Sequence, residues 1–417
     1  MIKDYYWYKS KKRKKIKTNS WFNTNTIINE NFRNFDNLEK PINKFLCCKE
    51  VEIYPNLEQR ELLLKWMNQF IDMYNHTNYF LNNNIYDYEN KKFKENSKEI
   101  LNFRKLRDNY IKDKKNETSQ NGINKHILDE AINHCVSKHK TCITNLFQKN
   151  IKFFRIRNMK KQRRKKIIII ENGLFSKKKN GFCITKLKEM KSSEPINVNK
   201  TSILQYDKHL NKFNLFIPIE KESSNISDRT KCGIAACAGV RTFLTCYSEK
   251  EILEIGENAN EKYKINYKKI DKTRELFEKN EINKKKFTKS INHNFDKIKN
   301  LTKDLHFKVS NTLCKKFNTI TIGKISTSNI VLNTNNLNKV SKRCMLSLSH
   351  YKFREILKYQ CNKFNTKLNI VDEAYTTKTC SNCNEINDIG SSKKYDCKKC
   401  DFTCDRDINA SINIFKK

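Results

Sequence analysis

The sequence predicts an α/β protein of two or three domains with a four-cysteine metal ribbon close to its C-terminus. Apolar, β-branched runs typical of strands alternate with stretches in which apolar residues recur at helical spacing. A length of 417 residues exceeds the usual size of one domain. Two CxxC pairs, with thirteen residues between them, stand near the end of the chain.

The two CxxC pairs predict a structural zinc site. Cys380 and Cys383 form the first pair, and Cys397 and Cys400 form the second. Four thiolates at this spacing can surround one Zn²⁺ tetrahedrally, with each sulfur about 2.3 Å from the ion. Disulfides are the alternative, but they are typical of secreted proteins, and this sequence has no feature of a secreted chain. Since all four ligands come from the protein, the zinc is expected to support structure and not chemistry.

Acidic residues flank the ribbon on both sides. A strand-like run, 368–371, is followed by Glu373, and Asp407 opens a helix in which Ile408, Ile412 and Phe415 share one face. The ribbon between them can bring the two carboxylates together. Paired acids are what a phosphodiester-cleaving site needs to hold Mg²⁺. A solvated charge or a helix cap is the alternative for either acid taken alone.

The charge of the chain predicts a nucleic-acid partner. Lys and Arg number 85 against 45 Asp and Glu, which gives a net charge of +40, and aromatic residues make up 11%. Such an excess suits a polyanion. Codon bias of an AT-rich genome also enriches Lys, Asn and Ile, and the salt dependence of binding separates the two explanations. No run of eighteen apolar residues and no apolar N-terminal segment is present, so the protein is expected to be soluble and intracellular, with no membrane partner and no small-molecule substrate.

The N-terminal part begins with a basic, Asn-rich segment, residues 1–45, for which a disordered arm is predicted. A nuclear-import signal or a phosphate-gripping arm is the alternative. The alternating run Phe45–Tyr54 predicts a strand that Pro55 ends. Asn56 and Gln59 then have the spacing of a capping box at the start of an amphipathic helix.

The densest basic stretch of the chain covers residues 153–166 and interleaves aromatic with cationic residues. Lysines attract phosphates as point charges, and arginines add bidentate and stacking contacts, so the stretch is a candidate nucleic-acid surface. A solvated charge run is the alternative. Strands are predicted after it at Ile167–Ile170, Phe182–Thr185 and Phe213–Pro218. The candidate contact residues are Arg155, Arg157, Lys160, Lys161, Arg163, Arg164, Lys165 and Lys166.

The C-terminal half predicts a second sheet. Residues 231–245 form an apolar run broken by Gly239, which fits a buried strand turning into a hairpin. Residues 255–318 predict a long charged helical hairpin, and Asn318–Lys324 alternates like a strand.

The motif TTKTCSNC…CKKC…DRDINASINI resembles the C-terminus of the transposon-encoded RNA-guided nucleases TnpB and Fanzor. The run IYPNLEQ, followed by a Trp and a Tyr-Asn pair, is similar to their N-terminal part. The resemblance implies a RuvC-like nuclease domain of the RNase H type, with the zinc ribbon inserted before its last catalytic acid. By that resemblance Asp407 is this last acid.

Two positions depart from the pattern that the resemblance implies. The first RuvC acid should stand two residues before Gly239, where this chain has Cys237. A thiol is soft and poorly matched to Mg²⁺, so weak or absent cutting is predicted. Gly323 stands where TnpB-type chains carry their second acid, but the Fanzor branch relocates that Glu to the position of Glu373. Glu373 and Asp407 are therefore the expected metal-holding acids, and Cys237 marks the missing one.

The resemblance also implies a domain organisation. An α/β RuvC-like domain with an inserted zinc ribbon follows an N-terminal β wedge-type barrel with an inserted helical lobe. The expected boundaries are a basic arm at 1–45, the wedge-type domain at 46–60 and 151–225, the helical lobe at 61–150, the RuvC-like domain at 226–379 and 401–417, and the ribbon at 380–400.

The function implied is a transposon-associated, RNA-guided DNA-binding protein, by resemblance a metal-dependent DNA endonuclease. Its expected partners are a guide RNA and target DNA, and its cofactors are structural Zn²⁺ and, in an active protein, catalytic Mg²⁺. Two alternatives remain, a guided DNA binder without nuclease activity and a zinc-ribbon nucleic-acid-binding protein without a guide.

Overall fold

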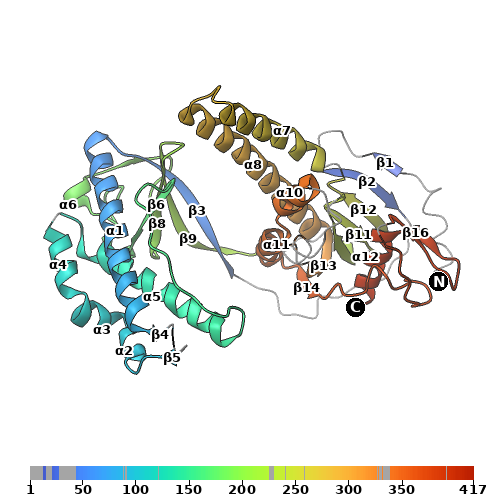
Figure 1. Cartoon of the computed structure of the whole chain (residues 1–417), viewed down its shortest axis with the longest axis horizontal. Helices are drawn as coiled ribbons and strands as arrows, with labels where there is room; N and C mark the ends of the chain where they lie inside the picture. The colour runs from blue at the N-terminus through green and yellow to red at the C-terminus, as the bar shows by residue number, and fades with distance from the viewer. Residues whose placement is uncertain are drawn as a thin grey trace. The chain divides into compact units, whose positions relative to one another are not determined.

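The computed structural model of the chain divides into two compact units, residues 46–221 and residues 1–45 with 222–417, each described here by itself. Figure 1 draws both. The residues that the structure describes are 13–15, 21–27, 44–87, 89, 92–120, 122–224, 230–239, 241–257, 259–325, 327, 331, 339–390 and 392–417.

A seven-stranded sheet forms the centre of the C-terminal unit, in the order β1-β2-β12-β11-β10-β13-β14. Strands β10, β11 and β12 pair antiparallel, as the hairpin pattern around Gly239 predicts. Strands β10, β13 and β14 pair parallel. The bounds are β1 Arg13–Lys15, β2 Phe22–Ile27, β10 Thr230–Ala238, β11 Leu244–Tyr247, β12 Glu251–Ile255, β13 Phe317–Gly323 and β14 Lys367–Val371.

The three parallel strands, β10, β13 and β14, determine where functional side chains can gather. Ala236 pairs with Ile322, and Gly323 pairs with Val371, so the three strands end at the same edge of the sheet. In α/β sheets, ligands bind outside the carboxyl ends of parallel strands. Cys237 and Glu373 therefore arrive at one edge, from segments more than a hundred residues apart in sequence.

Helices cover the two faces of this sheet differently. Side chains of a strand alternate between faces. Ile234 and Ala236 of β10 pack in one core with helices α7, α8, α10 and α11, whereas Ala235 and Cys237 face α12. Figure 1 shows α7 and α8 as the antiparallel hairpin expected for residues 255–318. The bounds are α7 Ala259–Glu278, α8 Lys284–Lys316, α10 Lys339–Leu348, α11 His350–Phe364 and α12 Arg406–Lys416.

Part of the predicted disordered arm belongs to the sheet. Strand β2 pairs antiparallel with β12, and β1 pairs with β2. Trp21 is buried, its ring lies under the ammonium of Lys262, and its indole Nε1 donates to Asp304 at 2.8 Å. The strand pairing and the buried Trp21 hold this segment against the rest of the unit. The composition of the segment alone does not reveal this. The rest of the arm lies outside the described residues.

The ribbon and the last helix complete this unit. Two short strands, β15 (Lys394–Asp396) and β16 (Thr403–Asp405), pair antiparallel and lead directly into α12. Asp405 caps that helix, because its carboxylate accepts from the backbone amide of Asp407 at 2.8 Å. As predicted, Ile408, Ile412 and Phe415 share an apolar face, which packs on Tyr247 and Ile252.

The N-terminal unit combines a five-stranded sheet, in the order β6-β8-β9-β3-β7, with helices α1 to α6 and a two-stranded sheet, β4-β5. Its strands include those predicted at Phe45–Tyr54, Ile167–Ile170 and Phe213–Pro218. The bounds are β3 Lys44–Tyr54, α1 Leu57–Asn84, β4 Tyr86–Asp87, β5 Lys92–Phe93, α2 Ser97–Ile100, α3 Phe103–Lys105, α4 Lys112–Gln120, α5 Lys125–Phe147, β6 Lys165–Ile170, α6 Ile184–Leu187, β7 Lys191–Ser192, β8 Ser202–Asp207 and β9 Lys212–Glu222.

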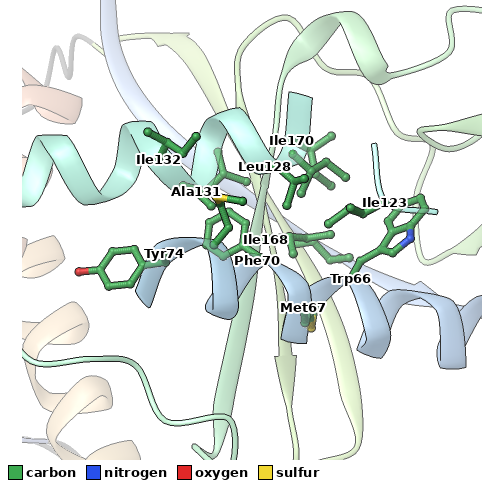
Figure 2. Close-up of a cluster of buried hydrophobic side chains, with 14 of the residues drawn as sticks. Trp66, Met67, Phe70, Tyr74, Ile123, Leu128, Ala131, Ile132, Ile168 and Ile170 are labelled. Atoms are coloured by element: carbon green, nitrogen blue, oxygen red, sulfur yellow. The ribbon is translucent and has the colours of Figure 1, made fainter. Parts of the chain in front are cut away.

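Helix α1 is the centre of this unit's core. Its predicted capping box is present: Gln59 N donates to the Asn56 side chain at 2.8 Å, and Asn56 N donates to the Gln59 side chain at 3.0 Å. Figure 2 shows the apolar face of α1 against α5 and β6. The labelled contacts are Trp66, Met67, Phe70 and Tyr74 of α1, Leu128, Ala131 and Ile132 of α5, Ile168 and Ile170 of β6, and Ile123.

One predicted strand, Phe182–Thr185, is wrong. Phe182 makes only an isolated bridge to Phe175, and Cys183 has a left-handed backbone with φ of 46°. That conformation redirects the chain into the short helix α6, because an extended strand cannot contain it. The wedge-type barrel and the inserted lobe stay predictions. Among the helices of the described chain, none is both long and apolar enough to cross a lipid bilayer.

Candidate functional site

Cys237 lies near the end of β10 and faces helix α12. It packs with Ala235 of its own strand and with Ala410 and Ile414 of the helix. Burial, followed by the negative charges of Glu373 and Asp407, raises the pKa of the Cys237 thiol well above its ordinary value. The side chain is therefore a neutral thiol, and both acids predicted from the sequence lie close enough to act on it.

Glu373 follows β14 and folds its side chain over the end of β13. A Cβ added to Gly323 would lie 1.9 Å from Glu373 Oε1 and 2.1 Å from its Cγ. The carboxylate thus occupies the space that a side chain at position 323 would need. Among the described residues, buried Oε1 has no hydrogen-bond partner. An orphaned buried oxygen of this kind is suited to a cation.

The electrostatic surroundings of Glu373 disfavour its charge. Burial raises the pKa of Glu373 to about 7, while the Ala238 amide and the Arg354 guanidinium act in the opposite direction. A carboxyl group that is half protonated near neutral pH becomes fully ionised when a divalent cation lies beside it. The site is therefore electrostatically prepared for a positive ligand.

Asp407 stands in the first turn of α12, on the same helical face as Ala410 and Ile414. Its Oδ2 lies 3.9 Å from the position that a Cβ on Gly239 would take, so the carboxylate faces the turn after β10. Burial, followed by the charge of Asp405, raises its pKa, and Arg406 partly offsets the effect. The packing of α12 on β10 is what places this acid.

The structure thus brings Cys237, Glu373 and Asp407 together at one edge of the sheet. Two carboxylates can bind a hard cation through oxygen. The third group is a thiol, which is a soft ligand and a poor bridge for Mg²⁺. The donor set fits Mg²⁺ at the two acids and does not fit it at Cys237. The family resemblance implies all three of these positions.

One neighbouring residue was missed in the sequence. Arg354 of α11 is almost fully buried, and its guanidinium donates to the Ile325 carbonyl at 3.3 Å. Its charge also stabilises the ionised form of Glu373. A charged residue among the core positions of α11 is the sequence feature that indicates it.

The four predicted cysteines form a cluster that can hold a metal ion. Their sulfur atoms all lie within 4.8 Å of one another. The Cys380–Cys400 and Cys383–Cys397 pairs are separated by 3.8 Å and 3.6 Å. Sulfurs bound tetrahedrally at 2.3 Å from an ion are separated by about 3.8 Å, so the observed spacing fits that geometry. Within the described part of the chain, no other group of three or more His, Cys, Asp or Glu gathers in this way.

Two asparagines of α12, missed in the sequence, tie the cluster to the acid site. Asn409 and Asn413 each donate to the Thr379 carbonyl at 2.7 Å. The backbone amide of Ser381 donates to the Asn409 side chain at 2.8 Å. These bonds join the first cysteine knuckle to the helix that carries Asp407. The i, i+4 spacing of the two asparagines, which places them on one face of the helix, is a recognisable signal.

The structure separates the eight basic candidates into two groups. Arg164 binds Asp207 through both carboxylate oxygens, at 3.1 Å and 3.2 Å. Lys161 pairs with Asp72. Lys166 donates to Asn68, and the side chain of Lys165 lies 4.0 Å from that of Asp207. These four therefore have partners within the protein. Arg155, Arg157, Lys160 and Arg163 are exposed, and Arg155 also has an interaction partner within the protein.

The raised pKa of Glu373 predicts a stability that depends on pH. In the unfolded chain this carboxyl ionises near its ordinary value of 4.5, whereas the folded protein retains the proton to about 7. Between these values the folded state binds more protons, so its free energy of unfolding falls as pH rises, by up to about 3 kcal/mol. Denaturation of the parent and of Glu373→Gln, without added Mg²⁺, measures the difference. Parallel pH profiles for the two proteins would contradict the assignment.

The contact between Gly323 and Glu373 predicts a second measurable effect. Gly323→Ala is expected to lower stability by about 1–3 kcal/mol, because the new Cβ displaces the Glu373 side chain. Adding Glu373→Ala should remove most of that loss, which a double-mutant cycle measures. Gly173→Ala is the matched control, since nothing lies within 4 Å of its Cβ. Equal losses with and without the Glu373 side chain would refute the contact.

Sequence comparisons relate the chain to known proteins. Residues 350–414 match the family model described as Cas12f1-like, TNB domain. The chain is 35% identical to TnpB-like protein R854 of Acanthamoeba polyphaga mimivirus, over 100% of this chain and 85% of that protein. It is also 35% identical to TnpB-like protein L770 of the same virus, over 96% of this chain and 83% of the relative.

A solved structure shares the fold. The protein in the cryo-EM structure of the Cas12f1–sgRNA–target DNA complex superposes with a TM-score of 0.52 at 14% identity, over 86% of this chain and 83% of that one. This likeness supports the α/β fold of the chain. The 35% identity to TnpB-like protein R854, over the full length of this chain, shows the family: the chain belongs to the TnpB-like proteins.

Proposed function

We propose that this protein is a transposon-associated, RNA-guided DNA-binding protein whose RuvC-like nuclease centre lacks its first carboxylate. The observation that carries the proposal is the position of Cys237, beside Glu373 and Asp407 at the carboxyl ends of the parallel strands. In this proposal Glu373 and Asp407 would supply two of the three acids of the nuclease centre. The third position holds a buried neutral thiol.

Metal ions are assigned from the donor atoms. The four cysteines suit structural Zn²⁺, because their sulfur spacing is that of a tetrahedral thiolate site. Glu373 and Asp407 are the residues that would hold Mg²⁺, which supplies activation of water for attack on a phosphodiester. Cys237 removes the bridging carboxylate from that set, so the parent protein is expected to bind Mg²⁺ weakly and to cut DNA poorly.

The proposed partners are a guide RNA and a target DNA. The Cas12f1 chain that shares the fold is solved with both kinds of nucleic acid. A net charge of +40 supports the same assignment here. Sequence specificity would come from base pairing, while the protein recognises the backbone and shape of the duplex. The proposal also implies a soluble protein with the predicted wedge-type and helical parts.

Sequencing the RNA that copurifies with the protein tests guidance. We expect one defined RNA species when the protein is expressed together with the DNA that flanks its gene. A heterogeneous mixture of cellular RNA would instead support a zinc-ribbon binder without a guide. The salt dependence of binding gives the number of phosphates that the protein contacts. A steep dependence would show that many of the Lys and Arg residues bind nucleic acid, whereas a weak one would attribute their excess to codon bias.

A further inference from the structure

The segment after helix α5 is extended and is held by side chains instead of by a neighbouring strand. Residues 153–160, called here the extended segment, have no regular secondary structure. Three asparagines of α1, called here the asparagine clamp, bind its backbone: Asn75, Asn78 and Asn82. They lie at positions i, i+3 and i+7, so they share one face of the helix.

The clamp reproduces the hydrogen bonding of a strand partner. Asn75 donates to the Met159 carbonyl at 2.9 Å and accepts from the Met159 amide at 2.7 Å. Asn82 binds the carbonyl and the amide of Ile156 in the same way, at 2.9 Å and 3.3 Å. A side-chain amide offers a donor and an acceptor in the geometry of a peptide group. The backbone of the extended segment is therefore fixed at two residues, Ile156 and Met159, by side chains from one face of α1.

The centre of the clamp is buried. Asn78 is fully buried, donates to the Ile156 carbonyl at 2.8 Å and lies 3.1 Å from Nε2 of buried His139. Phe154 packs its ring near His139. A buried amide is costly without partners, so these bonds strongly favour one conformation of the segment.

The opposite face of the extended segment is cationic and aromatic. Side chains of an extended chain alternate, and Phe154 points inward whereas Phe153, Arg155 and Arg157 are exposed. Phe153 is 73% exposed. Residues 153–160 contain no acid, and within the described part of the chain Arg157 has no carboxylate partner. A clamp that served only to anchor a loop would not require this face.

We propose that the extended segment is a preformed binding rail for a single-stranded stretch of nucleic acid, with the asparagine clamp as its positioning residues. Arg155, Arg157 and Lys160 would contact phosphates, and Phe153 would stack on an unpaired base. Fixing the backbone before binding reduces the ordering entropy lost on association. The inference deepens the proposed function, on whose nucleic-acid partner it rests.

The clamp is tested without changing charge. The double variant Asn75→Ala/Asn82→Ala of the full chain is expected to bind a labelled single-stranded oligonucleotide about 10-fold more weakly, with trypsin cutting faster after Arg157 and Lys160. Asn83→Ala is the matched control, since Asn83 is exposed on the same helix. Faster proteolysis with unchanged affinity would mean that the clamp is only structural, and would overturn the positioning role.

The binding face is tested with the clamp intact. Arg157→Gln/Lys160→Gln should reduce the salt dependence of single-strand binding by about 1.4 in the logarithmic slope, the value for two lost phosphate contacts. Phe153→Ala should weaken binding about 5-fold or more. Phe153→Trp should keep affinity and show quenched fluorescence on saturation. An unchanged slope together with unquenched tryptophan would refute the rail.

The choice of oligonucleotide identifies the strand that binds. Single-stranded RNA and DNA of one sequence are compared with the DNA duplex. A preference for single-stranded RNA points to the guide, and a preference for single-stranded DNA points to a displaced target strand. Preference for the duplex would overturn the single-strand assignment. These readouts do not depend on cleavage or on a defined guide, so failure of the proposed function leaves them interpretable.

Discussion

Cys237→Asp is expected to convert a protein with little Mg²⁺-dependent cleavage into one that cuts its target DNA. The substitution supplies a third carboxylate at a position on which the charges of Glu373 and Asp407 both act, where the parent has a neutral thiol. A cation held by three carboxylates contributes several kcal/mol of charge stabilisation, so we expect a rate at least about 100-fold above that of the parent. Cleavage is measured on DNA matched to the sequenced copurified RNA.

Two controls separate chemistry from packing. Cys237→Ser keeps the size of the side chain without a carboxylate and should remain inactive. Cys237→Asp/Asp407→Asn should lose whatever activity the single variant gains. Rapid Mg²⁺-dependent cutting by the parent would overturn the assignment of Cys237 as the missing acid, and so would an active double variant.

The same substitution should make stability depend on Mg²⁺. A third acid beside two carboxyls whose pKa is already raised adds like-charge repulsion, so Cys237→Asp should unfold at a lower temperature without the ion. Mg²⁺ should reverse that loss in the variant and have little effect on the parent, since binding to the folded state alone stabilises it. Thermal unfolding in both conditions gives this readout even where no guide is available.

Removing one zinc ligand is expected to have the second large effect. Cys397→Ser should reduce the bound zinc from about one per chain to near zero and unfold the ribbon, because structural Zn²⁺ contributes about 10–16 kcal/mol to the folding of zinc-finger peptides. The effect should spread to α12, since Asn409 and Asn413 bind the carbonyl of Thr379 beside the first knuckle. Hydrogen exchange across residues 376–417 and elemental analysis measure both consequences.

The chain contains its own control for this experiment. Cys404 is half-buried beside the ribbon and does not belong to the four-sulfur cluster. Cys404→Ser should therefore leave both the zinc content and the protection of α12 unchanged. If Cys397→Ser kept its zinc, or lost it without loosening α12, the proposed link between the ribbon and Asp407 would be wrong.

The sequence predicts the local features of this protein well. Cysteine spacing alone predicts the cluster, because knuckle geometry is a short-range property of the chain. The Asn56–Gln59 capping box and the strand that carries Cys237 also depend on neighbours in sequence. The positions of the acids follow from the family resemblance, and the structure adds the reason why Glu373 can replace an acid at Gly323: both would occupy one space.

Features that depend on distant partners could not be predicted from the sequence. The asparagine clamp joins α1 to residues about eighty positions later, and an amide pattern on a helix does not state what it binds. Trp21 and Phe22 likewise stand in a mostly polar segment, and only the pairing of β2 with the distant strand β12 shows that the segment belongs to the sheet. Cys183 took a left-handed conformation that hydropathy does not encode.

The pairing of β2 with β12 has a consequence for biosynthesis. Ile27 aligns with Glu251, so the ribosome makes 224 further residues before the partner of Ile27 exists. Residues 46–221 emerge in this interval and form a compact unit of their own. We therefore expect β2 to wait without its partner β12 during translation, since pairings this distant in sequence form slowly. An affinity tag fused next to Trp21 would then interfere with the last step of assembly and not the first.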